Sequence, residues 1–239
     1  MKKSVLGIMA VVALSSLPAA SYAQLAFNAS LTSDYRYRGI SQSRVKPALQ
    51  GGVDYAAGAF YVGAWASTIK WISDWDADSS VELDLYGGYK GTIIKDALTY
   101  DVGVLTYQYP GNKFDPSANT TEIYGAMTYG PATVKYSHAL THTFANADSK
   151  NSYYLEAAAT FDVGGFVLTP HVGYQKIKGP FSSDGSYTDY SFTVAKDFSG
   201  LVVSAALVGT DADKAFYSSP KTGKELGKAG LVLAVKYNF

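Results

Sequence analysis

The sequence contains no cysteine among its 239 residues, so we expect neither disulfide bonds nor a thiolate metal site. Histidine is also scarce, with three residues. Neither charge is in excess, because 20 acidic side chains balance 20 basic ones. A protein that binds nucleic acid usually carries a basic surplus that meets the phosphates, and we therefore predict no nucleic-acid partner.

The one long apolar run lies within the first 23 residues. Two lysines follow Met1, residues 4–17 are almost all apolar or small, and Ala23 ends a segment of small residues. This arrangement is typical of a secretory signal peptide, and we predict residues 1–23 to be cleaved after export through the inner membrane. Residues 24–239 lack a run of about 18 apolar residues, which excludes a transmembrane helix there. Their length suits one domain.

Aromatic residues and glycines are abundant instead, with 20 tyrosines, 11 phenylalanines and 23 glycines. Aromatic strand formers punctuated by glycine favour an all-β protein. The final segment alternates strictly, with an apolar side chain at every second position back from the C-terminus: Phe239, Tyr237, Val235, Leu233 and Leu231. A period of two predicts a strand with one apolar face and one more polar face.

The same alternation recurs along the chain and predicts about 12 strands. They lie near residues 25–38, 47–56, 60–68, 80–90, 98–109, 121–130, 132–140, 152–162, 166–177, 187–198, 201–210 and 228–239. Short connections alternate with long ones, with one exception at residues 91–97. An outer-membrane barrel has short turns at one end, longer loops at the other and an even number of strands. A soluble sandwich, the alternative, has no reason to keep this rhythm.

We therefore predict a single closed antiparallel transmembrane β-barrel in the bacterial outer membrane, with the first strand paired to the last. Ten or fourteen strands stay open, because the phase is blurred between residues 189 and 197, where Lys196 falls on the apolar side. The apolar face would contact outer-membrane lipid and the polar face would line the lumen. A C-terminal aromatic pair, Tyr237 and Phe239, is typical of the signal that the barrel-assembly machinery recognises. The oligomeric state is left open.

Five segments of the first half carry recognisable motifs in a fixed order. They are SDYRYRGISQS at 33–43, PALQGG at 47–52, FYVGAWAS at 60–67, ELDLYGGY at 82–89 and YQYPG at 107–111. In this order they resemble the TorF family of porins. The second half resembles that family through its strand rhythm and its terminal aromatic residue. The resemblance implies an outer-membrane barrel and a porin-like function.

Charged side chains fall on the polar faces of the predicted strands. We expect ten of them to line the pore: Asp34, Arg36, Arg38, Asp54, Glu82, Asp84, Glu122, Lys135, Glu156 and Lys236. Lys90 and Asp162 share this phase. Ionised groups in a barrel imply water or partners of opposite charge, because an isolated charge in a dry interior is very costly.

These charges favour an outer-membrane porin-like channel for the passive diffusion of small hydrophilic solutes or ions. Acidic residues outnumber basic ones among the inward positions, which favours a mild preference for cations. The alternative is a lumen filled by paired side chains, in a non-conducting structural or receptor and adhesion barrel that acts through its extracellular loops.

The loop at residues 74–80, with sequence DWDADSS, carries three alternating carboxylates. Such oxygen ligands suit Ca²⁺, but Ser79 and Leu85 stand where a helix–loop–helix calcium site needs Gly and Glu. A solvated acidic loop, or a loop whose flanking Trp71 and Trp75 fold over the mouth of the barrel, is the alternative. We predict no metal site and no cofactor.

Catalysis has little support in this sequence. The three histidines are His138, His142 and His171. Adjacent residues of a strand point to opposite faces, so Ser137 and His138 cannot form the hydrogen-bonded pair that a serine nucleophile needs. We predict that the protein is not an enzyme.

Overall fold

The fold is described here for residues 23–239, from a computed structural model. The predicted signal peptide lies outside these residues, apart from Ala23, and stays a prediction. Within residues 23–239, no helix is both long enough and apolar enough to cross a membrane.

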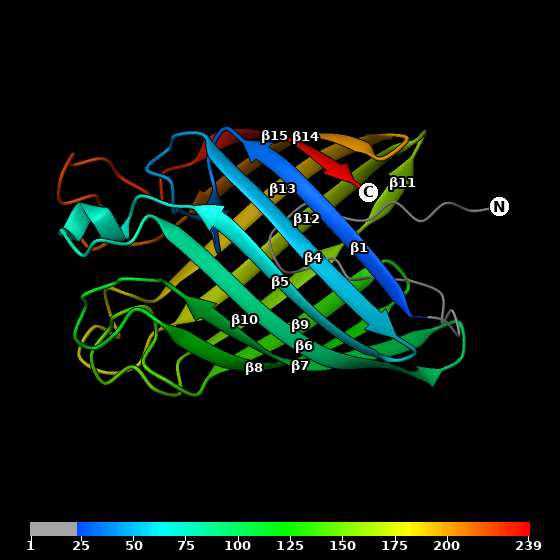
Figure 1. The fold of residues 1–239 in the computed structure, drawn as a ribbon, viewed down its shortest axis with the longest axis horizontal. Coiled ribbons are helices and arrows are strands. Elements are labelled where there is room, and N and C mark those ends of the chain that lie inside the picture. The colour runs from blue at the N-terminus through cyan, green and yellow to red at the C-terminus, as the bar shows by residue number, and fades with distance from the viewer. Residues whose placement is uncertain (1–22) are drawn as a thin grey trace.

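Twelve antiparallel strands form one closed barrel (Figure 1), so the predicted fold class is confirmed. Two segments, β10 and β11, form one strand of the wall that is interrupted at Thr160, and both pair with β12 in the same register. The wall strands are β1 (Gln24–Thr32), β4 (Ala48–Ala57), β5 (Phe60–Thr68), β6 (Val81–Ile94), β7 (Leu98–Gln108), β8 (Thr120–Tyr129), β9 (Ala132–Ala139), β10 (Tyr153–Ala159) with β11 (Phe161–Val163), β12 (Phe166–Lys176), β13 (Tyr187–Phe198), β14 (Leu201–Thr210) and β15 (Gly230–Asn238).

The sheet closes between its first and last strands, as predicted. The pairing of β1 with β15 runs from Asn28 opposite Asn238 to Thr32 opposite Ala234. On its other side, β1 pairs with β4 along its whole length. A bilayer offers no water to unpaired backbone groups, and a closed sheet is one of the two structures that satisfy all of them internally.

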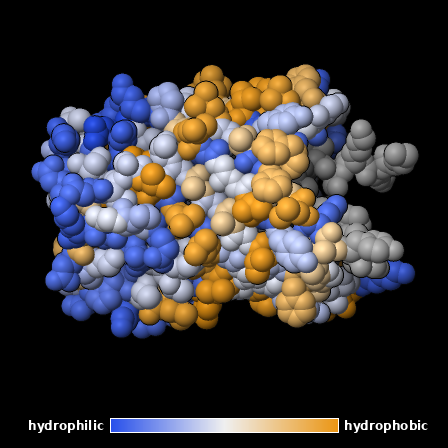
Figure 2. All heavy atoms as spheres, viewed as in Figure 1, coloured by the Kyte–Doolittle hydropathy of each residue, from blue (hydrophilic) through white to orange (hydrophobic). Residues whose placement is uncertain are grey.

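The apolar side chains of the strands face outward. On β15, the outward residues Leu231, Leu233, Val235 and Tyr237 are between 43% and 58% exposed, whereas the residues between them are half-buried. On the face that Figure 2 shows, apolar residues form a band across the barrel, and hydrophilic residues gather at one end of it. An outward apolar band matches the outer surface of a transmembrane barrel.

Lys196 on β13 accounts for the blurred phase in the sequence. The inward positions of β13 are buried without interruption from Tyr187 to Ala195, so the strand keeps one phase. Lys196 lies on the outward face near the end of the strand, and its ammonium group lies 4.6 Å from the ring centroid of Phe166 and 5.5 Å from that of Phe198. The aromatic faces attract the cation, so one outward lysine is tolerated near the rim.

Short turns join the strands at one end of the barrel and long loops join them at the other, and we call these the turn end and the loop end (Figure 1). The predicted exception at residues 91–97 is wrong. Strand β6 continues to Ile94, and the turn is closed by a 3.1 Å hydrogen bond from the Ala97 N–H to the Ile94 carbonyl. The alternation of short and long connections therefore holds around the whole barrel.

The first strand is shorter than the sequence predicts. It ends at Thr32, and residues 33–47 fold back as a first loop that contains the small hairpin β2 (Arg36–Tyr37) and β3 (Ile40–Ser41). The predicted strand extended to residue 38 because the alternation continues past Thr32. Asp34, Arg36 and Arg38 therefore belong to the first loop and not to the wall.

The largest apolar cluster lies at the loop end. It joins the first loop to β7 and to the second long loop through Tyr35, Ile69, Ile72, Leu105 and Tyr107, all exposed by 2% or less. Ile72 belongs to the short 3₁₀ helix η1 (Ile72–Trp75). Burial of these side chains fixes the first two long loops against the strands.

The C-terminal aromatic residue closes the sheet at the turn end. The Phe27 N–H donates to the Phe239 carbonyl at 2.9 Å, and the Phe239 N–H donates to the Phe27 carbonyl at 3.0 Å. The two rings stack with centroids 6.2 Å apart. The side chain of Phe239 is 65% exposed.

We predict that Phe239→Asp, or deletion of Phe239, lowers the amount of folded barrel in the membrane several-fold, because both the closing pair and the aromatic terminus are lost. Heat-modifiable mobility on a gel measures the folded fraction. Phe181→Asp, at an exposed loop aromatic, is the matched control and should leave that fraction unchanged. Folded fractions in both Phe239 variants that equal those of Phe181→Asp and of the unchanged protein would contradict this role of Phe239.

Candidate pore and its first loop

The structure places the predicted wall charges inside the barrel. Five are nearly fully buried, exposed by 1% to 7%: Glu82, Asp84, Glu122, Lys135 and Glu156. Asp54 and Lys236 are half-buried. Asp162 keeps the inward phase opposite the buried Val167, but it is exposed at the rim of the turn end, where it accepts a 3.2 Å hydrogen bond from the Gly165 N–H.

Tyrosines line the wall between these charges, and each lies against a glycine of a neighbouring strand. An added glycine Cβ would lie 1.9–2.6 Å from the nearest tyrosine atom in four pairs: Tyr86 with Gly63, Tyr61 with Gly88, Tyr124 with Gly103 and Tyr154 with Gly173. A residue with a Cβ would displace the ring. These glycines let the rings lie flat along the wall instead of crossing the lumen.

The tyrosine hydroxyls hold carboxylates in place. Four donate at 2.5–2.8 Å: Tyr35 to Glu82, Tyr61 to Asp101, Tyr86 to Asp54 and Tyr154 to Asp189. Hydrogen bonds to an ionised acceptor are short and about twice as strong as neutral ones. Sequence reasoning missed Asp101 and Asp189, although their inward phase identifies them: they face Lys90 and Gly173 in register.

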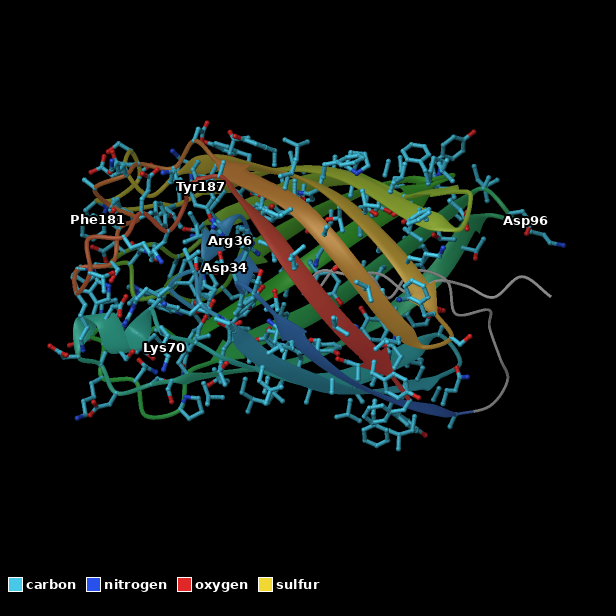
Figure 3. The ribbon with its side chains drawn as sticks, turned by 90° about the horizontal axis from the view of Figure 1, so that it is seen from above. Asp34, Arg36, Lys70, Asp96, Phe181 and Tyr187 are labelled. Atoms are coloured by element: carbon cyan, nitrogen blue, oxygen red, sulfur yellow. The ribbon has the colours of Figure 1, made fainter. Side chains whose placement is uncertain are left out.

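The first loop crosses the lumen at the loop end. Asp34 and Arg36 lie within the ring of strands, whereas Asp96 lies at the turn end (Figure 3). On one side Tyr35 reaches Glu82 of β6. At the tip, Gly39 lies against the opposite wall, where an added Cβ would be 2.3 Å from Thr210 Cγ2 of β14. Gly39 has a φ of +79°, which favours glycine at this close contact.

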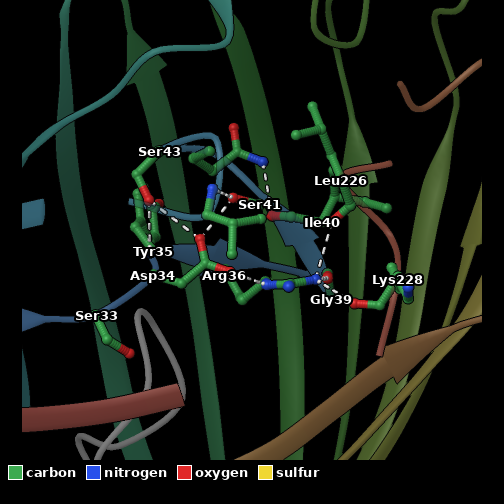
Figure 4. A network of polar contacts seen from close by, with 12 residues as sticks. Ser33, Asp34, Tyr35, Arg36, Gly39, Ile40, Ser41, Ser43, Leu226 and Lys228 are labelled. Carbon is green, nitrogen blue, oxygen red and sulfur yellow. Dashed lines mark hydrogen bonds and ion pairs between the residues drawn. The ribbon is translucent and has the colours of Figure 1, made fainter. Parts of the chain in front are cut away.

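Asp34 and Arg36 hold the first loop in its folded shape (Figure 4). The Asp34 carboxylate accepts hydrogen bonds from Arg36 Nε at 2.5 Å, Ser41 Oγ at 2.5 Å and Ser43 Oγ at 3.1 Å. Arg36 Nη1 also donates to the backbone carbonyls of the loop tip and of the last long loop, at 2.9 Å to Leu226. Arg36 therefore binds within the first loop and to the last long loop.

Arg38 ties the loop to two walls of the barrel. Its guanidinium donates to both Glu122 oxygens of β8, at 3.1 and 2.7 Å, and to Gln175 Oε1 of β12 at 2.6 Å. It lies 4.8 Å from the Tyr37 ring centroid and 4.3 Å from that of Tyr154. Burial opposes its charge, but the Glu122 carboxylate outweighs burial and raises the pKa of Arg38. The loop is therefore fixed by a bidentate ion pair between Arg38 and Glu122.

Burial decreases from the loop end towards the turn end. Glu82 and Asp84, beside the first loop, are 1% exposed. Further down the same strand, Lys90 has a side chain that is 31% exposed, and Asp101, 3.9 Å from it, has one that is 25% exposed. Water therefore reaches the lumen from the turn end, and the first loop covers it at the other.

The acidic segment of the second long loop is bound within the protein. Asp74 pairs with Arg44 of the first loop, and Asp78 pairs with Lys113 of the third. No group of three or more potential ligands in residues 23–239 is arranged to hold a metal ion. Trp71 packs on the rings of Tyr109 and Phe114 in the third long loop, whereas Trp75 is 58% exposed.

Two histidines, His138 and His171, have polar neighbours within hydrogen-bond distance. His138 lies on the outer face, 3.1 Å from Tyr136 Oη and from Asn151 Oδ1, whereas Ser137 is buried inside, so the two point apart as predicted. His171 lies in the lumen, with Nε2 3.1 Å from Glu156. It was not among the predicted pore residues.

Comparison with known proteins supports this architecture. A family described as "Bacterial protein of unknown function (Gcw_chp)" matches residues 17–239. The chain belongs to this family. Comparison with curated proteins gives no match.

Among solved structures, the fold resembles the NanC porin, with a TM-score of 0.56 at 9% sequence identity, over 90% of this chain and 99% of that one. It also resembles a membrane protein solved in work on in-meso crystallisation, with a TM-score of 0.50 at 8% identity, over 90% of this chain and 83% of that one. Acinetobacter baumannii OccAB3 gives 0.43 at 15% identity, over 94% of this chain and 66% of that one, which is too distant to carry an argument. Because the sequence identities are this low, the comparisons with NanC and the in-meso structure show only that the Gcw_chp chain shares their fold.

We predict that Gly63→Ala destabilises the Gcw_chp barrel by about 1–3 kcal/mol, because the new methyl group meets the Tyr86 ring at 2.5 Å. Gly125→Ala is the matched control, since its nearest neighbour would be 4.0 Å away. Urea unfolding followed by gel mobility measures both. Equal stabilities would mean that the rings do not need the glycines.

We predict that Arg38→Gln releases the first loop. Removing one partner of a buried ion pair typically costs about 3–5 kcal/mol, because Glu122 is left buried without its counter-charge. Trypsin should then cleave after Arg36, whose side chain is 5% exposed in the folded loop. Fragment masses identify the cut. Lys113→Gln removes an exposed ion pair and should not change cleavage there, and a first loop that resists trypsin equally in both variants would contradict the tether.

Proposed function

We propose that this protein is an outer-membrane channel for the passive diffusion of small hydrophilic solutes or ions. The observation that carries the proposal is the division of the wall, with apolar side chains outside and ionisable ones inside. Only a lumen that contains water or paired charges tolerates such an interior. The resemblance of the first-half motifs to TorF-family porins supports the same function.

The proposed pore has two parts. In the half towards the turn end, the side chains of Lys90 and Asp101 are partly exposed to water, and this half admits solute. The half towards the loop end is narrowed by the first loop, so a solute passes only between that loop and the wall or when the loop moves. Carboxylates and cations line both parts, and the excess of acidic groups favours cations mildly.

The second candidate is a non-conducting structural or receptor barrel that acts through its extracellular loops. One observation favours it: the first loop spans the lumen, and Asp34, Tyr35 and Ser41 in it are exposed by 3% or less. Such a barrel needs no path for solute. Its loops would then carry the function.

The remaining expectations fit either candidate. We propose a cleaved signal peptide at residues 1–23, assembly by the barrel-assembly machinery through Tyr237 and Phe239, and no catalytic role. Outer-membrane lipid would contact the apolar band, with the loop end facing outside the cell, because longer loops of such barrels lie on that side.

Single-channel recording of the refolded protein in a planar bilayer tests the channel. We predict discrete current steps, a reversal potential that indicates mild cation preference in a salt gradient, and larger steps for Arg38→Gln. Folded protein without current steps in either form would favour the structural or receptor barrel. Anion preference would contradict the assignment of the lumen charges.

A further inference from the structure

We propose that Asp84 is the centre of a binding site for organic cations that carry a guanidinium or ammonium group. The site lies in the lumen beneath the first loop. The inference deepens the proposed channel function and rests on it for the route by which solute reaches the site. It comes from how this barrel already binds its own cations.

Three cations of the lumen each lie near a carboxylate and over a tyrosine ring. Arg38 has Glu122 and the rings of Tyr37 and Tyr154. Lys90 lies 3.9 Å from Asp101 and 5.1 Å from the Tyr61 ring centroid. Lys135 lies opposite Glu156 in register, with its ammonium 4.4 Å from the Tyr124 ring centroid. The recurring unit is therefore an anion with an aromatic face, which together attract a nitrogen cation.

Asp84 has the same surroundings without a cation. It is 1% exposed, and neither carboxylate oxygen has a hydrogen-bond partner within residues 23–239. The two neighbouring carboxylates are engaged: Glu82 accepts from Tyr35 at 2.5 Å, and Glu122 binds Arg38. An unpaired buried carboxylate is costly in its ionised form, and a cation placed against it offsets part of that cost.

Aromatic rings surround Asp84 on the neighbouring elements. Trp65 of β5 and Tyr107 of β7 are its partners in register, one on each side. Tyr35 of the first loop packs edge-on against Trp65, with centroids 5.4 Å apart. Tyr86 follows two residues further along β6, on the same face and towards the turn end. A carboxylate among these rings suits an organic cation, whose charge and apolar surface both find partners.

The route to Asp84 leads along the tyrosine wall from the turn end. Tyr86, whose hydroxyl donates to Asp54 at 2.6 Å, lies between Asp84 and the more exposed positions around Lys90. The first loop covers Asp84 from the other side through Tyr35. A bound cation would therefore lie under the loop and displace side chains that now fill this space.

Calorimetric titration of the folded, detergent-solubilised barrel with methylguanidinium chloride tests the site. Methylurea has nearly the same shape without the charge and is the ligand control. We predict saturable binding of methylguanidinium, no saturation with methylurea, and affinity weakened about tenfold or more by Asp84→Asn. Asp184→Asn, the same substitution at an exposed loop position, should bind like the unchanged protein.

A second measurement does not depend on the Asp84 variant folding. With Trp71 and Trp75 replaced by Phe, Trp65 is the one tryptophan left of the three, and methylguanidinium should shift its emission saturably. Binding is read without current, so a barrel that binds but does not conduct contradicts the channel and leaves the site. Absence of saturable binding, equal binding of methylurea, or unchanged affinity in Asp84→Asn would overturn the site.

Discussion

Closure of the sheet between β1 and β15 is the constraint on which the rest of the structure depends. A strand at an open edge would expose a row of unpaired N–H and carbonyl groups to lipid, where nothing replaces their hydrogen bonds. β1 prevents this by pairing with β4 and β15 at once, and the backbone of Phe239 completes the seam opposite Phe27. Once the sheet is closed, the period of two along each strand separates an outer surface from an interior.

Closure of the sheet confines about half of the strand side chains to a narrow interior, where they must pack together. Small residues make room for large ones: glycines on neighbouring strands receive the tyrosine rings, and the tyrosine hydroxyls then hold the carboxylates. The first loop uses the same chemistry. Asp34 pairs with Arg36 and Arg38 pairs with Glu122, so the loop crosses the lumen with these charged groups paired.

The alternation of side chains was enough to predict the strands, their number and the closing pair, because in a membrane barrel each strand must keep one face apolar throughout. It failed where the same alternation served another purpose. Residues 33–38 continue the pattern of β1, yet the polar contacts of Asp34 turn the chain into the barrel. Lys196 interrupts the apolar pattern, but the strand continues through it, because the rings of Phe166 and Phe198 attract its ammonium group.

Inward orientation of the charges followed from strand phase, but their partners did not. Which residues meet across the lumen depends on strand register and on the path of the first loop. The alternation of apolar and polar side chains predicts neither of these. Arg38 reaches β8 and β12, far from the residues next to it in sequence. The hydrogen bond from Tyr154 to Asp189 likewise joins β10 to β13 across β12, and it follows from the register of these three strands.

The reactivity of single cysteines measures most directly whether the polar face meets water and the apolar face meets lipid, and the absence of native cysteine leaves no background. Asp101 and Val102 are neighbours on β7 that point to opposite faces, and the Asp101 side chain is 25% exposed whereas Val102 is 47% exposed. In a lipid bilayer, Asp101→Cys should react with a charged, water-soluble thiol reagent and Val102→Cys should not. Faster labelling of Val102→Cys would contradict the barrel's orientation towards lipid and water.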